Sequence, residues 1–380
     1  MATGRPYDLV LFGATGFTGQ LVAEELARQR TGVRWAVAGR DPQRLRDLVA
    51  SLVGIDPRHG GVDTIVADVD DLASLRAMAA STKVLTTTVG PYLKYGLPVL
   101  EACVGAGTSY LDLTGEPAFV ASSRAAFDDR AREARIKVVH CCGFDSIPAD
   151  LGTLFTVSKL PPGSRKQVRC YVRTNGQASG GTWSSFIEIL RTGGTGRPDR
   201  PLLHTVPDGS GRKALPLPVV DRDIVRESAR SRPDLYGPDF DYRHYLVVKS
   251  ARRAAQLVAG VSAAWALAQL GPTRRWLANR VKPGEGPDED RRKRSRFELT
   301  FIGKADGARV VTRVSGGDPG YTETSRILAH ASLLMAGDGP ALPATAGVLS
   351  PAVAFGTVLI ERLQRIGIMF EELTGTPSAS

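Results

Sequence analysis

The feature that most constrains the fold is an apolar stretch at residues 7–12 that runs into a glycine-rich turn at residues 13–19 and then into an apolar helical pattern. The turn reads G-x-x-G-x-x-G. Glycines between a strand and a helix let the backbone approach a pyrophosphate, whose charge then lies at the helix N-terminus. The spacing differs from the usual G-x-G-x-x-G, so the glycines alone are weak evidence. Together with their context they predict dinucleotide binding, the alternative being a turn without a ligand.

The first 150 residues alternate short β-rich runs with helical patterns, which is typical of a parallel sheet covered by helices. Strands are predicted at residues 7–12, 33–38, 64–67, 84–88, 110–113 and 137–141. Helices are predicted near residues 17–30, 42–53, 71–80, 95–106 and 117–134. Asp41 followed by Pro42 is typical of a helix start. We therefore predict an α/β protein with an N-terminal Rossmann-type doubly wound parallel sheet over residues 1–150.

The pattern changes after Asp150, where prolines and glycines interrupt shorter elements. Period-two alternation predicts strands at residues 166–174, 296–303 and 309–315. We predict a second, α+β substrate domain over residues 151–320, with a basic and apolar insertion at 243–296. Helical patterns at 324–336 and 353–371 fall in a C-terminal segment, 321–380, which we expect to pack back on the Rossmann domain.

Residues at the ends of the predicted strands indicate which cofactor is bound. The second strand ends at Arg40, whereas an NAD enzyme usually has an acid there for the ribose hydroxyls. A guanidinium suits the 2′-phosphate of NADPH, although a solvated surface arginine is the alternative. Asp41, the nearest acid, is explained by the helix start. Asp68 follows the third strand and is expected either to approach the adenine or to cap a helix.

Two further turns follow the fourth and sixth strands, at residues 89–92 and 143–148. Ligands of doubly wound sheets lie beyond the carboxyl ends of the strands, so we expect both turns to border the nicotinamide rather than to be structural turns only. The residues expected to bind the cofactor are Gly13, Thr15, Gly16, Phe17, Thr18, Gly19, Arg40, Asp68, Gly90, Pro91, Gly143, Phe144 and Asp145.

These motifs, with others further along, resemble the saccharopine dehydrogenase-like oxidoreductases over nearly the whole chain. The resemblance rests on residues 13–19, 38–40, 89–92, 103, 107–116, 143–148, 179–182, 317–321 and 347–352. It is greatest for the trans-acting enoyl reductases of mycobacterial-type complex lipid assembly. Ser350 stands where threonine is common in the family, which is a mild departure. The resemblance identifies the superfamily better than the reaction.

The resemblance implies an NADPH-dependent reductase of an α,β-unsaturated acyl thioester carried by a polyketide synthase, in phthiocerol or phenolphthiocerol dimycocerosate-type lipid biosynthesis. Such a reaction needs a proton donor besides the hydride. Tyr92 is the first candidate; Tyr95, Asp145 and His140 are weaker ones. Tyr92 is at least as well explained by packing over the cofactor or by the turn, and water is a further proton source.

Other functions remain open from the sequence. A saccharopine-type amino-acid dehydrogenase and a non-catalytic nucleotide-binding protein on membranes or lipid bodies are the alternatives to the enoyl reductase. Tyr245 and Lys249, with Ser231 upstream, match the Tyr-x-x-x-Lys of short-chain dehydrogenases, but they lie outside the predicted βα series and are rejected as catalytic residues. The four cysteines lack metal-ligand spacing, so no metal is expected.

The net charge of +10 is concentrated in one stretch, because residues 243–296 contain 13 basic and 4 acidic side chains. Within it, residues 254–273 are uncharged and are bracketed by arginine pairs at 252–253 and 274–275. This pattern suits an anionic membrane surface, the mouth of a lipid-binding cavity or a buried helix with solvated arginines. The basic run 291–296 suits an acidic acyl carrier protein or lipid headgroups. Nucleic acid is not expected, because no recognition module accompanies the charge.

The predicted location is the cytoplasm, with peripheral contact at the inner face of the membrane through residues 252–296. The N-terminus lacks the apolar core of a signal peptide, and the cysteines show no disulfide framework.

Overall fold

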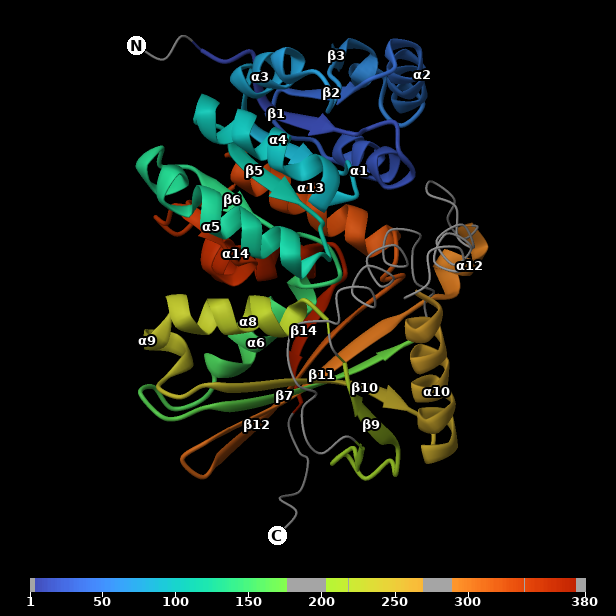
Figure 1. Cartoon of the computed structure of the whole chain (residues 1–380), viewed down its shortest axis with the longest axis vertical. Coiled ribbons are helices and arrows are strands. Elements are labelled where there is room, and N and C mark those ends of the chain that lie inside the picture. The colour runs from blue at the N-terminus through green and yellow to red at the C-terminus, as the bar shows by residue number, and fades with distance from the viewer. Residues whose placement is uncertain (1–3, 176–202, 218, 269–288, 338, 374–380) are drawn as a thin grey trace. The chain divides into compact units, whose positions relative to one another are not determined.

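The chain forms two units, which the computed structural model describes at residues 4–175, 203–217, 219–268, 289–337 and 339–373 (Figure 1). The first unit comprises Met1–Phe144 and Tyr321–Arg362. The second comprises Asp145–Gly320 and Leu363–Ser380. Each unit is built around its own seven-stranded sheet.

The first sheet is parallel throughout, in the order β13-β6-β5-β4-β1-β2-β3. Its strands are β1 (Tyr7–Phe12), β2 (Trp35–Gly39), β3 (Asp63–Val66), β4 (Thr82–Thr87), β5 (Ser109–Asp112), β6 (Lys137–Val139) and β13 (Gly347–Leu349). The strand order reverses between β1 and β4. In a doubly wound sheet, ligands bind at such a reversal, beyond the carboxyl ends of the strands. The predicted Rossmann-type fold is therefore confirmed.

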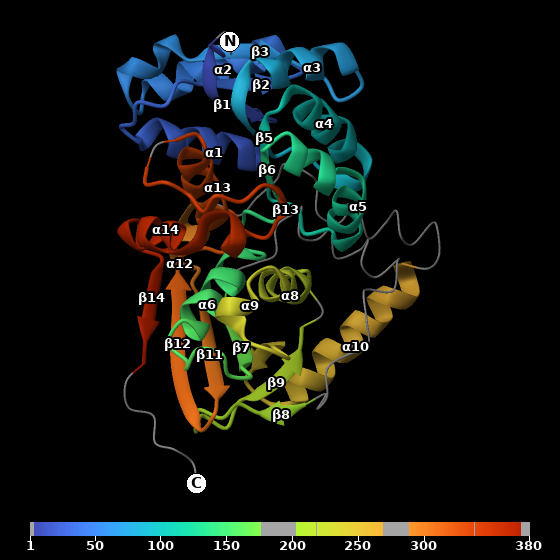
Figure 2. The same cartoon turned by 90° about the vertical axis from the view of Figure 1, so that its left-hand side faces the viewer.

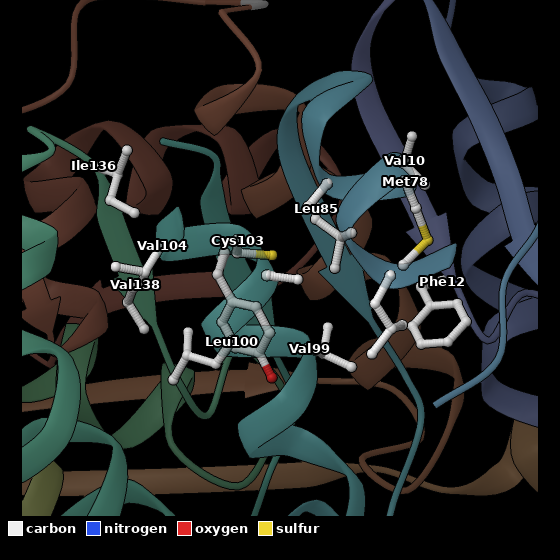
Figure 3. Close-up of a cluster of buried hydrophobic side chains, with 14 of the residues drawn as sticks. Val10, Phe12, Met78, Leu85, Val99, Leu100, Cys103, Val104, Ile136 and Val138 are labelled. Atoms are coloured by element: carbon white, nitrogen blue, oxygen red, sulfur yellow. The ribbon is translucent and has the colours of Figure 1, made fainter. Parts of the chain in front are cut away.

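Helices cover both faces of this sheet (Figure 2). They are α1 (Phe17–Arg28), α2 (Pro42–Val53), α3 (Leu72–Ala80), α4 (Tyr92–Ala106), α5 (Pro117–Glu133), α13 (Thr322–Met335) and most of α14 (Pro351–Arg365), with a short 3-10 turn at Pro57–Gly61. Helix α1 packs against α13, while α4 packs against both α3 and α5. A core of aliphatic and aromatic side chains fills the space between the sheet and α3, α4 and α5 (Figure 3). The central strands are apolar along most of their length because helices bury both faces.

The second sheet is mixed, in the order β14-β12-β11-β7-β10-β9-β8. Its strands are β7 (Gln167–Thr174), β8 (His204–Thr205), β9 (Lys213–Pro216), β10 (Asp241–Val248), β11 (Phe297–Ala305), β12 (Ala308–Gly316) and β14 (Met369–Glu372). The helices of this unit are α6 (Ile147–Val157), α8 (Asp221–Ser231), α9 (Pro233–Tyr236), α10 (Ala251–Ala268) and α12 (Glu289–Arg294). The β11–β12 hairpin turns at Asp306 and Gly307, both with positive φ, as a two-residue hairpin loop requires. The predicted α+β class of this second unit is confirmed.

The C-terminal segment, residues 321–380, was predicted to pack as a whole on the Rossmann domain, but the structure divides it between the two units. Helix α13 and most of α14 belong to the first unit, but the chain from Leu363 onward belongs to the second. The helical pattern predicted to reach residue 371 ends at Arg365, and β14 pairs with β12 instead. The first boundary lies after Phe144 rather than at residue 150.

The short-chain dehydrogenase match begins at Tyr245 on the second sheet, and Lys249 follows directly after the end of β10. Tyr245 is a buried residue of strand β10, and its ring stacks on Tyr171. Residues four apart on a strand are separated by roughly 13 Å. The Tyr-x-x-x-Lys pair therefore does not bring its two polar groups together, in agreement with its rejection from the sequence.

Candidate functional site

The phosphate loop is a tight connection between β1 and α1. Gly13 has φ of +83° and its N–H donates to the Ala38 carbonyl at 2.9 Å. A Cβ on Gly13 would lie 2.7 Å from Val89 Cγ2 and 2.8 Å from Thr88 Oγ1, so the loops after β1 and β4 touch. A Cβ on Gly19 would lie 2.1 Å from the Gly13 carbonyl oxygen. Both positions therefore require glycine.

The N-terminus of α1 is open, unlike those of the next three helices. Its N-cap, Gly16, has no side-chain hydrogen bond, and the first turn holds no acidic residue. By contrast, Asp41 caps α2, Asp71 caps α3, and Glu116 accepts from the first N–H groups of α4. The first N–H groups of any helix have no partner within the helix, and together with the positive helix end they make the start of α1 suited to a pyrophosphate. The loop residues Thr15, Phe17 and Thr18 lie at this same helix start.

Two arginines lie between the end of β2 and the first turn of α2. Arg40 is exposed and has no hydrogen bond or ion pair within the described part of the chain. Arg44, in the first turn of α2, donates from Nη2 to the Thr15 carbonyl at 2.7 Å. Of the two, only Arg40 was predicted. Arg44 was missed because its contact with the Thr15 carbonyl is a tertiary one. Together they offer two guanidinium groups, which fit a 2′-phosphate.

Asp68 lies just past β3, and its carboxylate accepts from Asp70 N–H at 3.1 Å. It does not cap α3, because Asp71 Oδ1 accepts from the N–H groups of Ala73 and Ser74 at 2.9 and 3.3 Å. The capping alternative for Asp68 is therefore wrong. Its approach to the adenine stays a prediction.

Glu116 holds the start of α4, directly after the Gly90–Pro91 turn. Its two carboxylate oxygens accept from Tyr92 N–H and Leu93 N–H, each at 2.9 Å. The turn at the end of β4 is thus held by a side chain from the loop after β5. This role was missed, since nothing in the spacing shows which helix the carboxylate reaches.

A buried network joins the loops that follow β5 and β6. Asp112 Oδ1 accepts from Thr114 N–H and Cys141 N–H at 3.1 Å, and Oδ2 lies 2.7 Å from His140 Nδ1. His140 Nε2 lies 2.7 Å from Ser123 Oγ on α5. Since His140 is only 1% exposed, it positions these loops and is poorly accessible as a proton donor.

Tyr92, the first candidate for catalysis, is buried. Its hydroxyl donates to the Thr87 carbonyl at 3.2 Å, and its ring lies 5.7 Å from that of Phe119. Burial, together with the Asp112 carboxylate, raises the pKa of Tyr92 well above its ordinary value. This arrangement favours a structural role for Tyr92 at the turn, while its packing over the cofactor and its catalytic role stay predictions. Tyr95, a weaker candidate, is half-buried beside Lys94.

The turn after β6 is anchored to α13. Phe144 N–H donates to Thr324 Oγ1 at 3.1 Å, and a Cβ on Gly143 would lie 3.1 Å from Thr324 Cγ2. Asp145 follows as a half-buried residue, and burial raises its pKa to about 6. Of the weaker proton-donor candidates it is the one that combines partial exposure with a pKa near neutrality.

The structure thus brings all but one of the residues predicted to bind the cofactor to one edge of the first sheet; Asp145 is instead the first residue of the second unit. Those after β1, β2 and β3 are Gly13 to Gly19, Arg40 and Asp68; those after β4 and β6 are Gly90, Pro91, Gly143 and Phe144. The arrangement provides an anion site, a 2′-phosphate site and two turns near the reversal of strand order. The residues fit NADPH. The resemblance motif at residues 179–182 lies outside the described residues.

Comparisons with known proteins agree with this site. Residues 9–139 match the model of the saccharopine dehydrogenase NADP binding domain. A putative trans-acting enoyl reductase of Mycobacterium tuberculosis is 36% identical, covering 97% of this chain and 98% of that protein. A saccharopine dehydrogenase-like oxidoreductase of Rattus norvegicus is 31% identical, covering 98% of both chains. The solved apo saccharopine dehydrogenase (L-Glu forming) of Saccharomyces cerevisiae shares the fold, with a TM-score of 0.57 at 14% identity over 97% of this chain and 99% of that chain.

Fold and site together define an NADP-binding oxidoreductase whose cofactor is NADPH. The chain belongs to the saccharopine dehydrogenase family.

Arg40→Gln is expected to raise the Kd for NADPH about 10- to 100-fold and to leave the Kd for NADH unchanged, because only NADPH carries the 2′-phosphate. Cofactor fluorescence titration measures both constants. Arg46→Gln is the matched control, since Arg46 is an exposed arginine of α2 that bonds Gln43 instead. An equal loss for both cofactors would contradict the assignment of Arg40.

Glu116→Gln is expected to raise the Kd for NADPH about 10-fold, because an amide nitrogen replaces one acceptor and leaves an N–H of α4 unpaired. Isothermal titration measures the loss. Glu101→Gln is the matched control. Glu101 lies on α4, the helix whose N–H groups Glu116 binds, but it pairs with Arg130 at the surface. Unchanged NADPH affinity in the Glu116 variant would show that this carboxylate does not position the turn for the cofactor.

Proposed function

We propose that the protein is an NADPH-dependent enoyl reductase that saturates a carbon–carbon double bond in an acyl thioester. The observation that carries the proposal is the full-length similarity to relatives named trans-acting enoyl reductases, which include a Mycobacterium ulcerans protein 32% identical over 96% of this chain and 97% of that protein. The open phosphate site beside Arg40 and Arg44 supports it by supplying a place for NADPH.

The proposed substrate is a polyketide-derived acyl chain in complex lipid biosynthesis of the phthiocerol or phenolphthiocerol dimycocerosate type. A reductase that acts in trans receives its substrate from another protein, so we expect an acyl carrier protein of a polyketide synthase to present the thioester. The support for this pathway is the mycobacterial origin and the naming of the relatives.

The bound cofactor supplies a hydride to the β-carbon of the enoyl thioester. The protein must then hold the acyl chain in place and deliver a proton to the α-carbon, so that one hydride and one proton together saturate the bond. Asp145 is the proposed proton donor. It follows the Gly143–Phe144 turn directly and keeps its proton up to a pH of about 6.

The surroundings of Asp145 in the second unit support a protonated carboxyl group. Asp221, in the first turn of α8, is buried and accepts from Ser146 Oγ at 3.3 Å. Burial, with added repulsion from the carboxyls of Asp145 and Asp150, raises the pKa of Asp221 well above its ordinary value. Once one of these buried carboxyl groups is ionised, its negative charge opposes ionisation of the others. The neighbouring carboxyl groups therefore help Asp145 to keep the proton that it would donate.

The test is to incubate the pure protein with NADPH and enoyl thioesters on coenzyme A and on acyl carrier proteins, and to follow NADPH absorbance. We expect oxidation with an enoyl thioester and none with the saturated analogue. The family supports one other candidate, a saccharopine-type dehydrogenase, which lysine plus 2-oxoglutarate would reveal by the same absorbance change. Oxidation with that pair alone would overturn the enoyl reductase.

A further inference from the structure

Helix α10 (Ala251–Ala268) presents apolar side chains to solvent. Leu257 is 41% exposed, Val258 52% and Leu267 38%, which makes them some of the most exposed large apolar residues of the described chain. Ala254, near the start of the helix, is buried, and α10 contacts β9 and β10. Figure 2 shows the helix extending to one side of the second sheet.

The apolar side chains continue a stripe that begins at the sheet. Leu257 and Val258 follow Ala254 by three and four residues, so they lie on the same face of the helix. The sheet covers this face at Ala254 and leaves it open at the next turn. The buried-helix alternative for this stretch is therefore wrong for these side chains. The remainder of the predicted stretch, residues 269–288, lies outside the described residues.

Three cations precede or begin this helix. Lys249, Arg252 and Arg253 are all exposed, and none of them has a side-chain hydrogen bond or ion pair within the described residues. Helix α10 contains no acidic residue. The exposed side chains Leu257 and Val258 thus adjoin a positive charge that no carboxylate among the described residues neutralises.

We propose that α10 binds the surface of an anionic lipid bilayer. Leu257 and Val258 enter the boundary between headgroups and acyl chains, and the three cations contact lipid phosphates. Leu267 lies nine residues after Val258, on the opposite side of the helix, and takes no part in this contact. Across the described residues no helix is long and apolar enough to cross a membrane, so the helix lies on the surface. An acidic carrier protein matches the cations alone, whereas an anionic bilayer matches both the charge and the exposed aliphatic side chains.

The experiment is flotation of the full-length protein with vesicles of phosphatidylcholine plus phosphatidylglycerol, beside vesicles of phosphatidylcholine alone. We expect binding to the anionic vesicles. The triple variant Lys249→Gln, Arg252→Gln and Arg253→Gln should lower the partition coefficient about 100-fold, since each cation near an anionic surface contributes roughly a factor of five. Leu257→Ser with Val258→Ser should also weaken binding, at every salt concentration.

The matched control replaces three exposed cations elsewhere in the second unit: Arg165→Gln, Lys304→Gln and Arg309→Gln. It should bind vesicles as the wild type does. NADPH affinity, unchanged in every variant, shows that each one is folded and keeps this test separate from that of the proposed reaction. The proposal is overturned by absence of binding to anionic vesicles, by an equal loss in the control, by binding that survives both α10 variants, or by binding only to an acidic carrier protein.

Discussion

Gly19→Ala is expected to raise the Kd for NADPH at least about 100-fold and to weaken NADH binding equally. The new Cβ would lie 2.1 Å from the Gly13 carbonyl oxygen and 2.9 Å from Ala14 Cα. Both contacts are with backbone, so α1 must move away from β1 and the N–H groups that meet the pyrophosphate move with it. Overpacking of this kind also lowers the free energy of unfolding by about 1–3 kcal/mol.

Gly105→Ala is the matched control for this change. Gly105 is also a helical glycine of the first unit, but a Cβ there would have no neighbour within 4 Å. Alanine should stabilise α4 by roughly 1 kcal/mol and leave NADPH binding unchanged. Thermal melting, beside cofactor titration, separates a folded Gly19 variant without affinity from an unfolded one. Wild-type affinity in a folded Gly19→Ala protein would contradict the placement of the pyrophosphate.

Asp145→Asn is expected to lower kcat for enoyl reduction about 100-fold and to change the Kd for NADPH much less. A carboxyl group that donates a proton in the transition state contributes 10²–10⁴-fold, and an amide cannot replace it. Since the pKa of Asp145 is raised to about 6, its carboxyl group is fully protonated, and able to donate, well below pH 6. The protonated fraction falls as the pH rises through 6. The wild-type rate should therefore fall about tenfold per pH unit above 6, whereas the residual rate of the variant should not depend on pH in this range.

The stability of the Asp145 variant distinguishes chemistry from folding. A carboxyl pKa that is raised on folding means that the folded protein binds more protons between pH 3.8 and 6, so stability falls as pH rises through that window. Asparagine removes this dependence, and the variant should melt no earlier than the wild type at pH 8. Asp129→Asn, on the exposed face of α5, serves as control with unchanged rate. A pH-independent wild-type rate, or full activity of the Asp145 variant, would exclude it as the proton donor.

The sequence predicted the first sheet well because its signals are local. Buried parallel strands are continuous apolar runs, and Asp41 with Pro42 marks the start of α2 by short-range hydrogen bonds alone. The three-residue strand β13 was missed because its partner, β6, lies about 200 residues earlier in the chain and only the fold brings them together. Strand β14 was read as the end of a helix for the same reason.

The candidate site likewise contains residues that the sequence predicts and residues whose roles only the folded structure shows. The glycine loop and Arg40 follow from position after a strand, so they were predicted. The roles of Arg44, Asp112 and Glu116 depend on which backbone groups their side chains reach, and these are tertiary contacts. Burial of Tyr92 could not be read from the turn that precedes it, because Phe119 and the Thr87 carbonyl that surround it come from other elements.

Transfer of deuterium from NADPH to the acyl chain would show directly that the protein is an enoyl reductase. NADPH deuterated at C4 of the nicotinamide is incubated with the protein and an enoyl thioester on an acyl carrier protein, and the acyl product is analysed by mass spectrometry. We expect one deuterium at the β-carbon of a saturated chain, with the α-carbon hydrogen coming from solvent. Oxidation of NADPH without a deuterated acyl product, or no turnover with any enoyl thioester while lysine plus 2-oxoglutarate is reduced, would contradict it.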